Sequence, residues 1–202
     1  MATPEVRQRL AAILAADVAG YSRLMGDDER ATIATLNRYR EVFRDTVEAN
    51  RGRIVDMAGD SVLAIFETAA GAVLAAVAVQ NALAERNADL ASDRRMAFRI
   101  GVHLGDIFEQ EDGSIYGDGV NVAARLESLA EPGRVCVSDM ARGAVRGQLE
   151  LGFTDLGEQT VKNIAEPVRA YQVGAAGANG AQERSAAAGQ RIDKPSIAVL
   201  PF

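Results

Sequence analysis

Strand-like and helix-like segments alternate along most of this chain, and this alternation limits the fold to the α/β or α+β class. Leu10–Val18 and Met96–Leu104 are apolar runs typical of strands, and the second alternates apolar residues with a period of two. Asp27–Asn50 carries apolar residues at helical spacing, and Thr68–Asn87 is an alanine-rich helical segment. We therefore expect a sheet packed against helices.

Shorter elements complete the predicted domain. Arg53–Met57 and Val62–Phe66 flank a tight Ala-Gly-Asp turn and predict a hairpin. Asp106–Gln110 is predicted as the hairpin partner of Met96–Leu104, ending at the turn signal Asp112-Gly113. The remaining predictions are helices at Gly119–Leu129 and near Asp139–Arg146, and strands at Arg134–Ser138, Gly152–Asp155 and Val168–Val173.

Composition excludes several classes of function. The chain has 202 residues and a net charge of −6, and nucleic-acid affinity depends on clustered Lys and Arg, so we expect no nucleic-acid partner. Cys136 and His103 are the single cysteine and histidine, which excludes an internal disulfide and a Cys/His zinc site and fits the cytoplasm. The longest apolar run, Ala69–Val79, is about half of a membrane span, so no membrane segment is expected.

The composition changes after Val173. Residues 174–193 are rich in small and polar residues and predict a flexible linker. Residues 194–202 resemble a strand, which cannot fold alone. We interpret residues 1–173 as one domain and residues 194–202 as the first strand of a truncated following domain. The alternative is an arm that packs back on the domain.

Two aspartates, Asp17 and Asp60, stand at the ends of strand-like runs, each with a glycine within three residues. Carboxylates that converge at strand ends can chelate Mg²⁺ or Mn²⁺, and such ions assist phosphoryl and nucleotidyl transfer. Alternatively, Asp17 caps the following helix and Asp60 is an ordinary turn residue.

Asn121 and Arg125 lie four residues apart on a predicted helix and therefore share one face. A neutral donor and a guanidinium directed at one point suit a pentavalent phosphorus, where negative charge develops on the non-bridging oxygens. Taken alone, an Asn-x-x-x-Arg pair is better explained as part of a solvated helix face.

Taken together, five ordered motifs resemble the class III nucleotidyl cyclase catalytic domain, the family of adenylyl and guanylyl cyclases. The resemblance covers roughly Leu10–Val173. The motifs are Asp17-Val-Ala-Gly-Tyr-Ser, Gly59-Asp60, Phe98-Arg-Ile-Gly-Val-His, Tyr116-Gly-Asp-Gly-Val-Asn-Val-Ala-Ala-Arg125 and Leu156-Gly followed by Val161-Lys-Asn. The resemblance implies a ferredoxin-like βαββαβ core sheet with helices on one face and extra C-terminal strands.

The resemblance implies a metal and phosphate half of a site. Asp17 and Asp60 look like the ligands of two Mg²⁺ or Mn²⁺ ions per site, with the Val18 carbonyl as an extra ligand. Arg99 and Lys162 match basic residues that contact phosphates. Backbone amides and a hydroxyl at a helix N-terminus would hold the β- and γ-phosphates. These backbone amides and this hydroxyl belong to Ala19, Gly20, Tyr21 and Ser22.

Asn121 and Arg125 match the family's transition-state pair, in which the asparagine orients the ribose and the arginine stabilises the reacting phosphate. The implied reaction is attack of the ribose 3′-oxygen of ATP on the α-phosphate, which releases pyrophosphate and closes a 3′,5′-cyclic ring. In this family the two halves of a site come from different chains. This chain carries both halves, so the resemblance implies a symmetric homodimer with two sites.

Purine choice in this family depends on a lysine four residues before the second metal aspartate and an aspartate seven residues before the asparagine. Here those positions hold Asp56 and Ser114. An ionised carboxylate only accepts hydrogen bonds, either from the adenine 6-amino group or from guanine N1–H and the 2-amino group. We favour ATP, with GTP as the alternative, and a third possibility is a degenerate module that binds nucleotide or dimerises without turnover.

Overall fold

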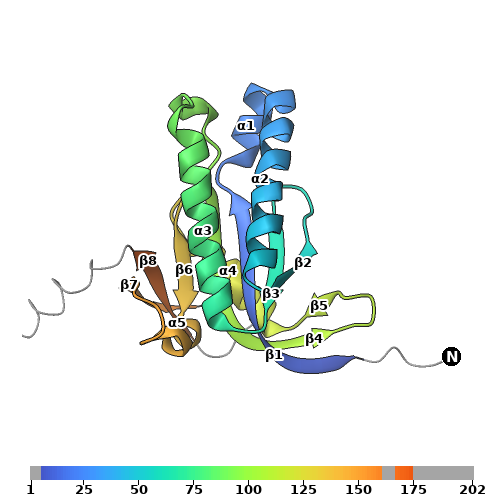
Figure 1. Cartoon of the computed structure of the whole chain (residues 1–202), viewed down its shortest axis with the longest axis vertical. Coiled ribbons are helices and arrows are strands. Elements are labelled where there is room, and N and C mark those ends of the chain that lie inside the picture. The colour runs from blue at the N-terminus through green and yellow to red at the C-terminus, as the bar shows by residue number, and fades with distance from the viewer. Residues whose placement is uncertain (1–5, 161–166, 175–202) are drawn as a thin grey trace, which may run out of the picture.

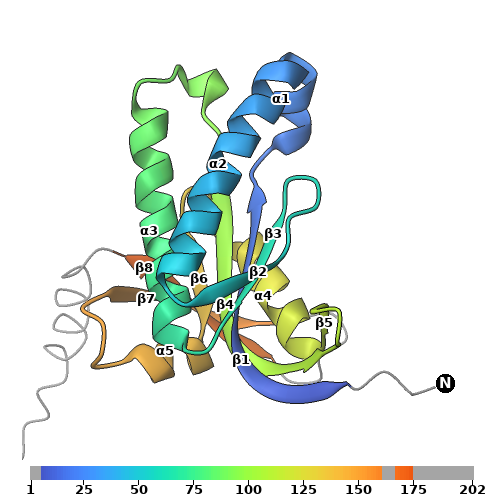
Figure 2. The ribbon, with the colours of Figure 1, turned by 45° about the vertical axis from the view of Figure 1, so that its right-hand side comes forward.

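The computed structural model describes residues 6–160 and 167–174. Its centre is an antiparallel pair of long strands, β1 (Arg7–Val18) and β4 (Phe98–Glu109), which lie in register along their whole length. Within the described residues the sheet order is β2-β3-β1-β4-β6-β8-β7, and β5 pairs with β4 (Figures 1 and 2). The other strands are β2 (Gly52–Asp56), β3 (Val62–Phe66), β5 (Ile115–Tyr116), β6 (Val135–Ser138), β7 (Gly152–Gln159) and β8 (Val168–Gly174).

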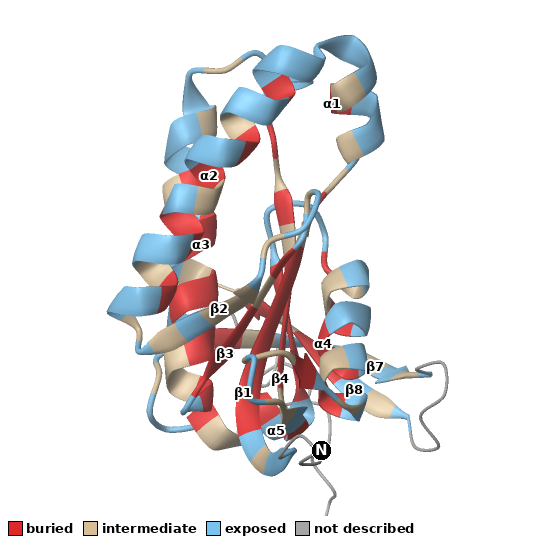
Figure 3. Ribbon diagram, turned by 90° about the vertical axis from the view of Figure 1, so that its right-hand side faces the viewer, coloured by how far each residue is buried: buried red, intermediate tan, exposed pale blue. Residues whose placement is uncertain are grey.

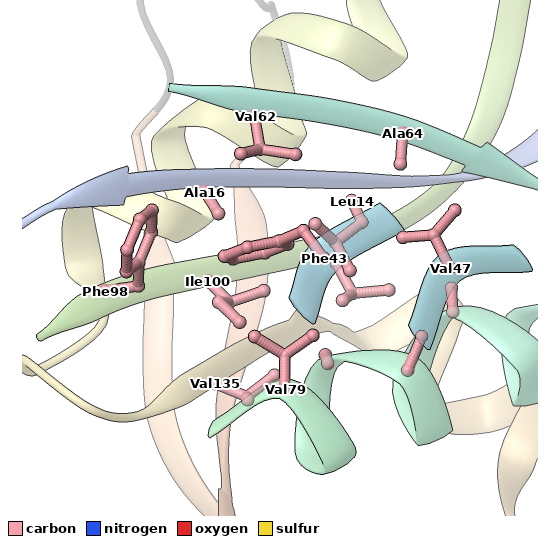
Figure 4. Packing of buried hydrophobic residues seen from close by; sticks show 14 of the residues in the cluster. Leu14, Ala16, Phe43, Val47, Val62, Ala64, Val79, Phe98, Ile100 and Val135 are labelled. Carbon is pink, nitrogen blue, oxygen red and sulfur yellow. The ribbon is translucent and has the colours of Figure 1, made fainter. Parts of the chain in front are cut away.

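Two long helices, α2 (Glu29–Ala49) and α3 (Ala69–Ala88), cover one face of this sheet (Figure 3). Figure 4 shows Phe43 of α2 and Val79 of α3 among the strand side chains, with the Phe43 and Phe98 ring centroids 4.9 Å apart. Because successive strand side chains point to opposite faces, alternate positions of β1 and β4 make this core. They include Ala12, Leu14, Ala16, Ile100 and Val102.

The fold class is confirmed, but the helices do not all lie on one face as expected. α4 (Asp118–Leu129) packs on the opposite face, where Ala123 joins a cluster that includes Ile13 and Ile107 (Figure 3). Gly101 explains how the helix approaches β4 so closely. A Cβ at Gly101 would lie 2.2 Å from both the Ala123 carbonyl oxygen and the Glu127 amide nitrogen.

Local capping signals set the starts of the two long helices. The Asp28 carboxylate accepts a hydrogen bond from the Ala31 amide and begins α2, and the Thr68 hydroxyl caps α3 in the same way. Short helices were predicted only in part. α1 (Tyr21–Asp27) begins where the resemblance implied a helix N-terminus, and α5 (Asp139–Val145) was predicted. The 3-10 turn η1 (Ser92–Arg94) was not predicted.

One predicted hairpin is wrong. Asp106–Gln110 does not fold back on Met96–Leu104, because β4 continues to Glu109 and pairs with β1 throughout. The turn signal Asp112-Gly113 is correct, but it joins β4 to the short strand β5.

The predicted linker at 174–193, apart from Gly174 at the end of β8, and the predicted strand at 194–202 lie outside the described residues. Among the helices that the structure describes, none is long and apolar enough to span a membrane.

Candidate active site

Asp17 and Arg99 face each other across the central strand pair, where the β1–β4 register makes them direct partners. Arg99 Nε donates to Asp17 Oδ1 at 2.9 Å and Nη2 donates to Oδ2 at 2.5 Å. This is the bidentate geometry that an arginine and a carboxylate favour. The two side chains are only 24% and 29% exposed. The predicted metal ligand and the predicted phosphate contact therefore form an ion pair.

Glu127 of α4 is a third titratable group at this position, and it was not predicted. Its side chain is 12% exposed, and Oε1 lies 3.6 Å from Arg99 Nη2, with no hydrogen-bond partner among the described residues. Burial, reinforced by the nearby Asp17 carboxylate, raises the pKa of Glu127 to about 8. A sequence signal existed, because Glu127 follows the buried Ala123 by four residues on the predicted helix and so shares its face.

Asp60 lies in the turn between β2 and β3, beside the end of β1 that carries Asp17. The β1–β3 register ends with Ala16 opposite Val62, two residues beyond Asp60. The pKa of Arg99 is raised, mainly by its hydrogen bond to Asp17 and in smaller part by the charges of Glu127 and Asp60. Asp60 is thus close enough to act on the ion pair, and the structure brings both predicted metal ligands to one region.

The donor set at this region fits a nucleotide-bound metal. Mg²⁺ is usually held by one or two carboxylates together with substrate phosphates, and it favours oxygen ligands. Asp17 and Asp60 supply such carboxylates. Among the described residues, no three Asp, Glu, His or Cys side chains group into a site that could hold a metal without a substrate.

The segment after Asp17 turns directly into α1. Val18 is the last residue of β1, and the Ala19 amide donates to the Ala97 carbonyl at 2.9 Å, so this amide already has a partner. Gly20 has a φ of +70° and occupies the N-cap position without any side-chain cap. Tyr21 and Ser22 then open the helix, where first-turn amides lack intrahelical acceptors. These amides are the ones available to an anion.

Asn121 and Arg125 lie on the exposed face of α4. Neither side chain forms a hydrogen bond or ion pair within the described part of the chain. Their helix nevertheless reaches the Asp17–Arg99 pair from its other face, through Glu127. Lys162 lies outside the described residues, so its prediction stays open.

Asp56, at the predicted purine site, is an exposed residue that ends β2, next to an irregularity in the β2–β3 ladder. Ser114 lies in the β4–β5 hairpin, where its amide and hydroxyl both hydrogen-bond to Asp112 Oδ1. Arg53 links β2 to the β4–β5 hairpin. Its guanidinium donates to Glu109 Oε1 at 2.6 Å and to the Gly113 carbonyl, next to Ser114, at 3.1 Å.

Comparison with known sequences identifies the family. The model of the adenylate and guanylate cyclase catalytic domain matches residues 5–175. The chain belongs to this family. The class III resemblance is thereby confirmed for nearly all of the described cyclase domain.

Relatives of this cyclase domain carry cyclase names. A Rhizobium meliloti (strain 1021) protein named "Putative adenylate cyclase 3" is 46% identical over 205 aligned residues, which cover all of this chain and 35% of that protein. An "Adenylate cyclase" of Glutamicibacter nicotianae is 29% identical and matches 79% of this chain and 38% of its own length. The chain thus spans little more than a third of the length of these two curated relatives.

Solved structures show the same cyclase fold. The adenylate/guanylate cyclase/hydrolase from Silicibacter pomeroyi has 45% sequence identity and a TM-score of 0.78, with 83% of this chain and 98% of that chain covered. The adenylyl cyclase CyaB from P. aeruginosa, at 22% identity, has a TM-score of 0.73 over 84% of this chain and 96% of that one. The second likeness shows the fold alone.

Proposed function

We propose that this domain converts ATP to 3′,5′-cyclic AMP and pyrophosphate, as a symmetric homodimer that uses Mg²⁺ or Mn²⁺. The observation that supports it most is the division of predicted site residues within one chain. Asp17, Asp60 and Arg99 gather at one region, whereas Asn121 and Arg125 are exposed on α4 without partners among the described residues. Two copies arranged head to tail would complete each set with the other.

The metal half would consist of Asp17 and Asp60, with the Val18 carbonyl as an additional ligand. A bound divalent ion supplies Lewis-acid stabilisation of the phosphate charge and lowers the pKa of the attacking hydroxyl. Arg99, which already lies against Asp17, would contact the terminal phosphates together with Lys162. The amides that open α1 and the Ser22 hydroxyl would hold the same phosphates.

The transition-state half would come from the second copy. Asn121 would hold the ribose so that its 3′-oxygen lies in line with the α-phosphate. Arg125 would neutralise the charge that develops on the non-bridging oxygens as the pyrophosphate leaves. Both side chains are on a rigid helix, which suits residues that must be placed within fractions of an ångström.

ATP is the proposed substrate because the two curated relatives described above carry adenylate cyclase names. GTP is the alternative, and Asp56 is the observation that favours it. Guanine presents two adjacent donor groups to an exposed carboxylate, whereas adenine presents one. Ser114 can donate or accept and does not separate the two purines.

The test is turnover of ATP and GTP, side by side, with Mg²⁺ and with Mn²⁺, with the cyclic product separated by chromatography. Asp60→Asn and Asn121→Ala should each abolish product formation. Mixing the two variants should restore about a quarter of the parent activity, because half of the dimers are mixed and each has one intact site. Parent protein that turns over neither nucleotide would refute the proposed activity, and mixtures without restored activity would refute the shared site.

A further inference from the structure

Arg40 of α2 reaches across to the β2–β3 turn, although its helix lies in a different layer from the predicted active site. One guanidinium nitrogen, Nη2, donates to the Met57 carbonyl at 2.9 Å and also to the Gly59 carbonyl. Asp60, the predicted metal ligand, is the next residue along the chain. The arginine therefore holds the backbone on the N-terminal side of this ligand.

Met57 packs against the hydrophobic core, but few other hydrogen bonds of the described residues hold the backbone of this turn. Ser61 closes it locally, through its amide and its hydroxyl, which donate to the Ala58 carbonyl at 3.0 and 2.9 Å. Gly59 adopts a φ of +57°, a conformation that glycine takes without strain. The carbonyls of three successive residues are thus all bound, and Arg40 binds two of them. Among the described residues, the hydrogen bonds to Ala58 would be the only ones left to these three carbonyls if Arg40 were removed.

The way in which Arg40 is buried argues against a purely stabilising role. Its Nε is buried and has no hydrogen-bond partner among the described residues. A buried donor without an acceptor costs free energy, and native structures contain few such groups. An apolar side chain at this position of α2 would avoid that cost, but it could not bind the carbonyls of the turn.

We propose that Arg40 is a positioning residue that fixes the turn presenting Asp60 to the metal. This inference rests on the proposed function, in which Asp60 is a metal ligand. Groups that orient a ligand in this way often change metal affinity by 10- to 100-fold when they are removed. Arg40 would act on Asp60 through the backbone and would touch neither the metal nor the nucleotide.

The test compares Arg40→Met with Arg44→Met in the full 202-residue chain. Arg44 lies one turn further along α2, is exposed, and forms no hydrogen bond or ion pair among the described residues, so it is a matched control. Mn²⁺ binding is measured by electron paramagnetic resonance, with Mn²⁺ alone and with α,β-methylene-ATP present. We expect Arg40→Met to weaken Mn²⁺ binding about tenfold and Arg44→Met to leave it unchanged.

A local readout separates positioning from a general loss of stability. Hydrogen exchange at the Ser61 amide should accelerate in Arg40→Met while exchange in β1 stays as in the parent. Arg40→Lys, which keeps a donor and a charge, should recover part of the Mn²⁺ affinity. Asp60→Asn tests the metal site separately from the role of Arg40. If it leaves Mn²⁺ binding unchanged, the metal site itself is wrong, whereas weakening by Asp60→Asn but not by Arg40→Met overturns the role of Arg40 alone.

Discussion

The single histidine provides a direct test of how burial controls charge in this domain. His103 lies in β4 with only 8% of its surface exposed, and its Nδ1 is 2.8 Å from the Ser138 hydroxyl. Ser138 is also the N-cap of α5, where its hydroxyl oxygen accepts from the Ala141 amide. Burial lowers the pKa of His103 from 6.5 to about 4, so the imidazole is neutral in the folded protein at neutral pH.

The sign of the resulting pH dependence follows from where the proton binds. Between pH 6.5 and pH 4 the unfolded chain protonates His103 and the folded chain does not, so stability falls as the pH is lowered. At about 1.4 kcal/mol for each pKa unit, His103 alone should remove about 2 kcal/mol between pH 7 and pH 5. Above the ordinary pKa of histidine, His103 is neutral in both the folded and the unfolded state, so it causes no loss of stability there.

The assay compares the parent with His103→Asn, which keeps a polar atom near Ser138 but cannot ionise. Urea unfolding at pH 7 and pH 5 should show that the variant loses about 2 kcal/mol less than the parent over this interval. The packing cost of the smaller side chain is the same at both pH values, so it cancels when the free energies of unfolding at pH 7 and pH 5 are subtracted for each protein. Because the chain has one imidazole, its pKa can also be read directly from one NMR titration. A folded-state pKa near 6.5, or equal losses in both proteins, would refute the reasoning.

Two further predictions concern the contact between α4 and the sheet. Gly101→Ala would place its Cβ 2.2 Å from the Ala123 carbonyl oxygen, and we expect a loss of about 3 kcal/mol in urea unfolding. Gly143→Ala, a helix position with nothing within 4 Å, is the matched control and should be neutral or stabilising by about 0.5–1 kcal/mol. Glu127→Gln should stabilise the metal-free protein by about 2 kcal/mol or more at pH 8.5 and have little effect at pH 5, since the folded state resists ionisation of Glu127 up to pH about 8. Equal effects of Glu127→Gln at both pH values, in EDTA, would contradict that account.

The order of the elements was predictable because it depends on local patterns. Apolar runs, helical spacing, and the caps at Asp28 and Thr68 lie within a few residues of the boundaries that they set. The wrong hairpin after Met96–Leu104 shows the limit of such patterns. A period of two indicates a strand, but it does not say where the strand ends or which partner it takes. Only the pairing of β4 with β1 along its whole length decides this.

The same limit applies to the candidate site. Asp17, Asp60 and Arg99 could be selected by motif. The direct pairing of Asp17 with Arg99, however, depends on the register of two strands, and these two residues are 82 positions apart in the sequence. Glu127 and Arg40 were missed for a related reason. Each is an ionisable residue on a predicted helix, where such a side chain usually faces solvent, and only tertiary packing brings it to the Asp17–Arg99 pair or to a turn.

The two faces of α4 would serve different purposes in the proposed homodimer. One face carries Ala123 and Glu127 against the sheet, beside the Asp17–Arg99 pair of the same chain. The exposed face carries Asn121 and Arg125, which would complete the site of the other copy. Glu127, Asn121 and Arg125 lie on the same twelve-residue helix, so a shift of that helix relative to Arg99 would also displace Asn121 and Arg125. Each chain would therefore connect the metal half of one site to the transition-state half of the other through a single helix.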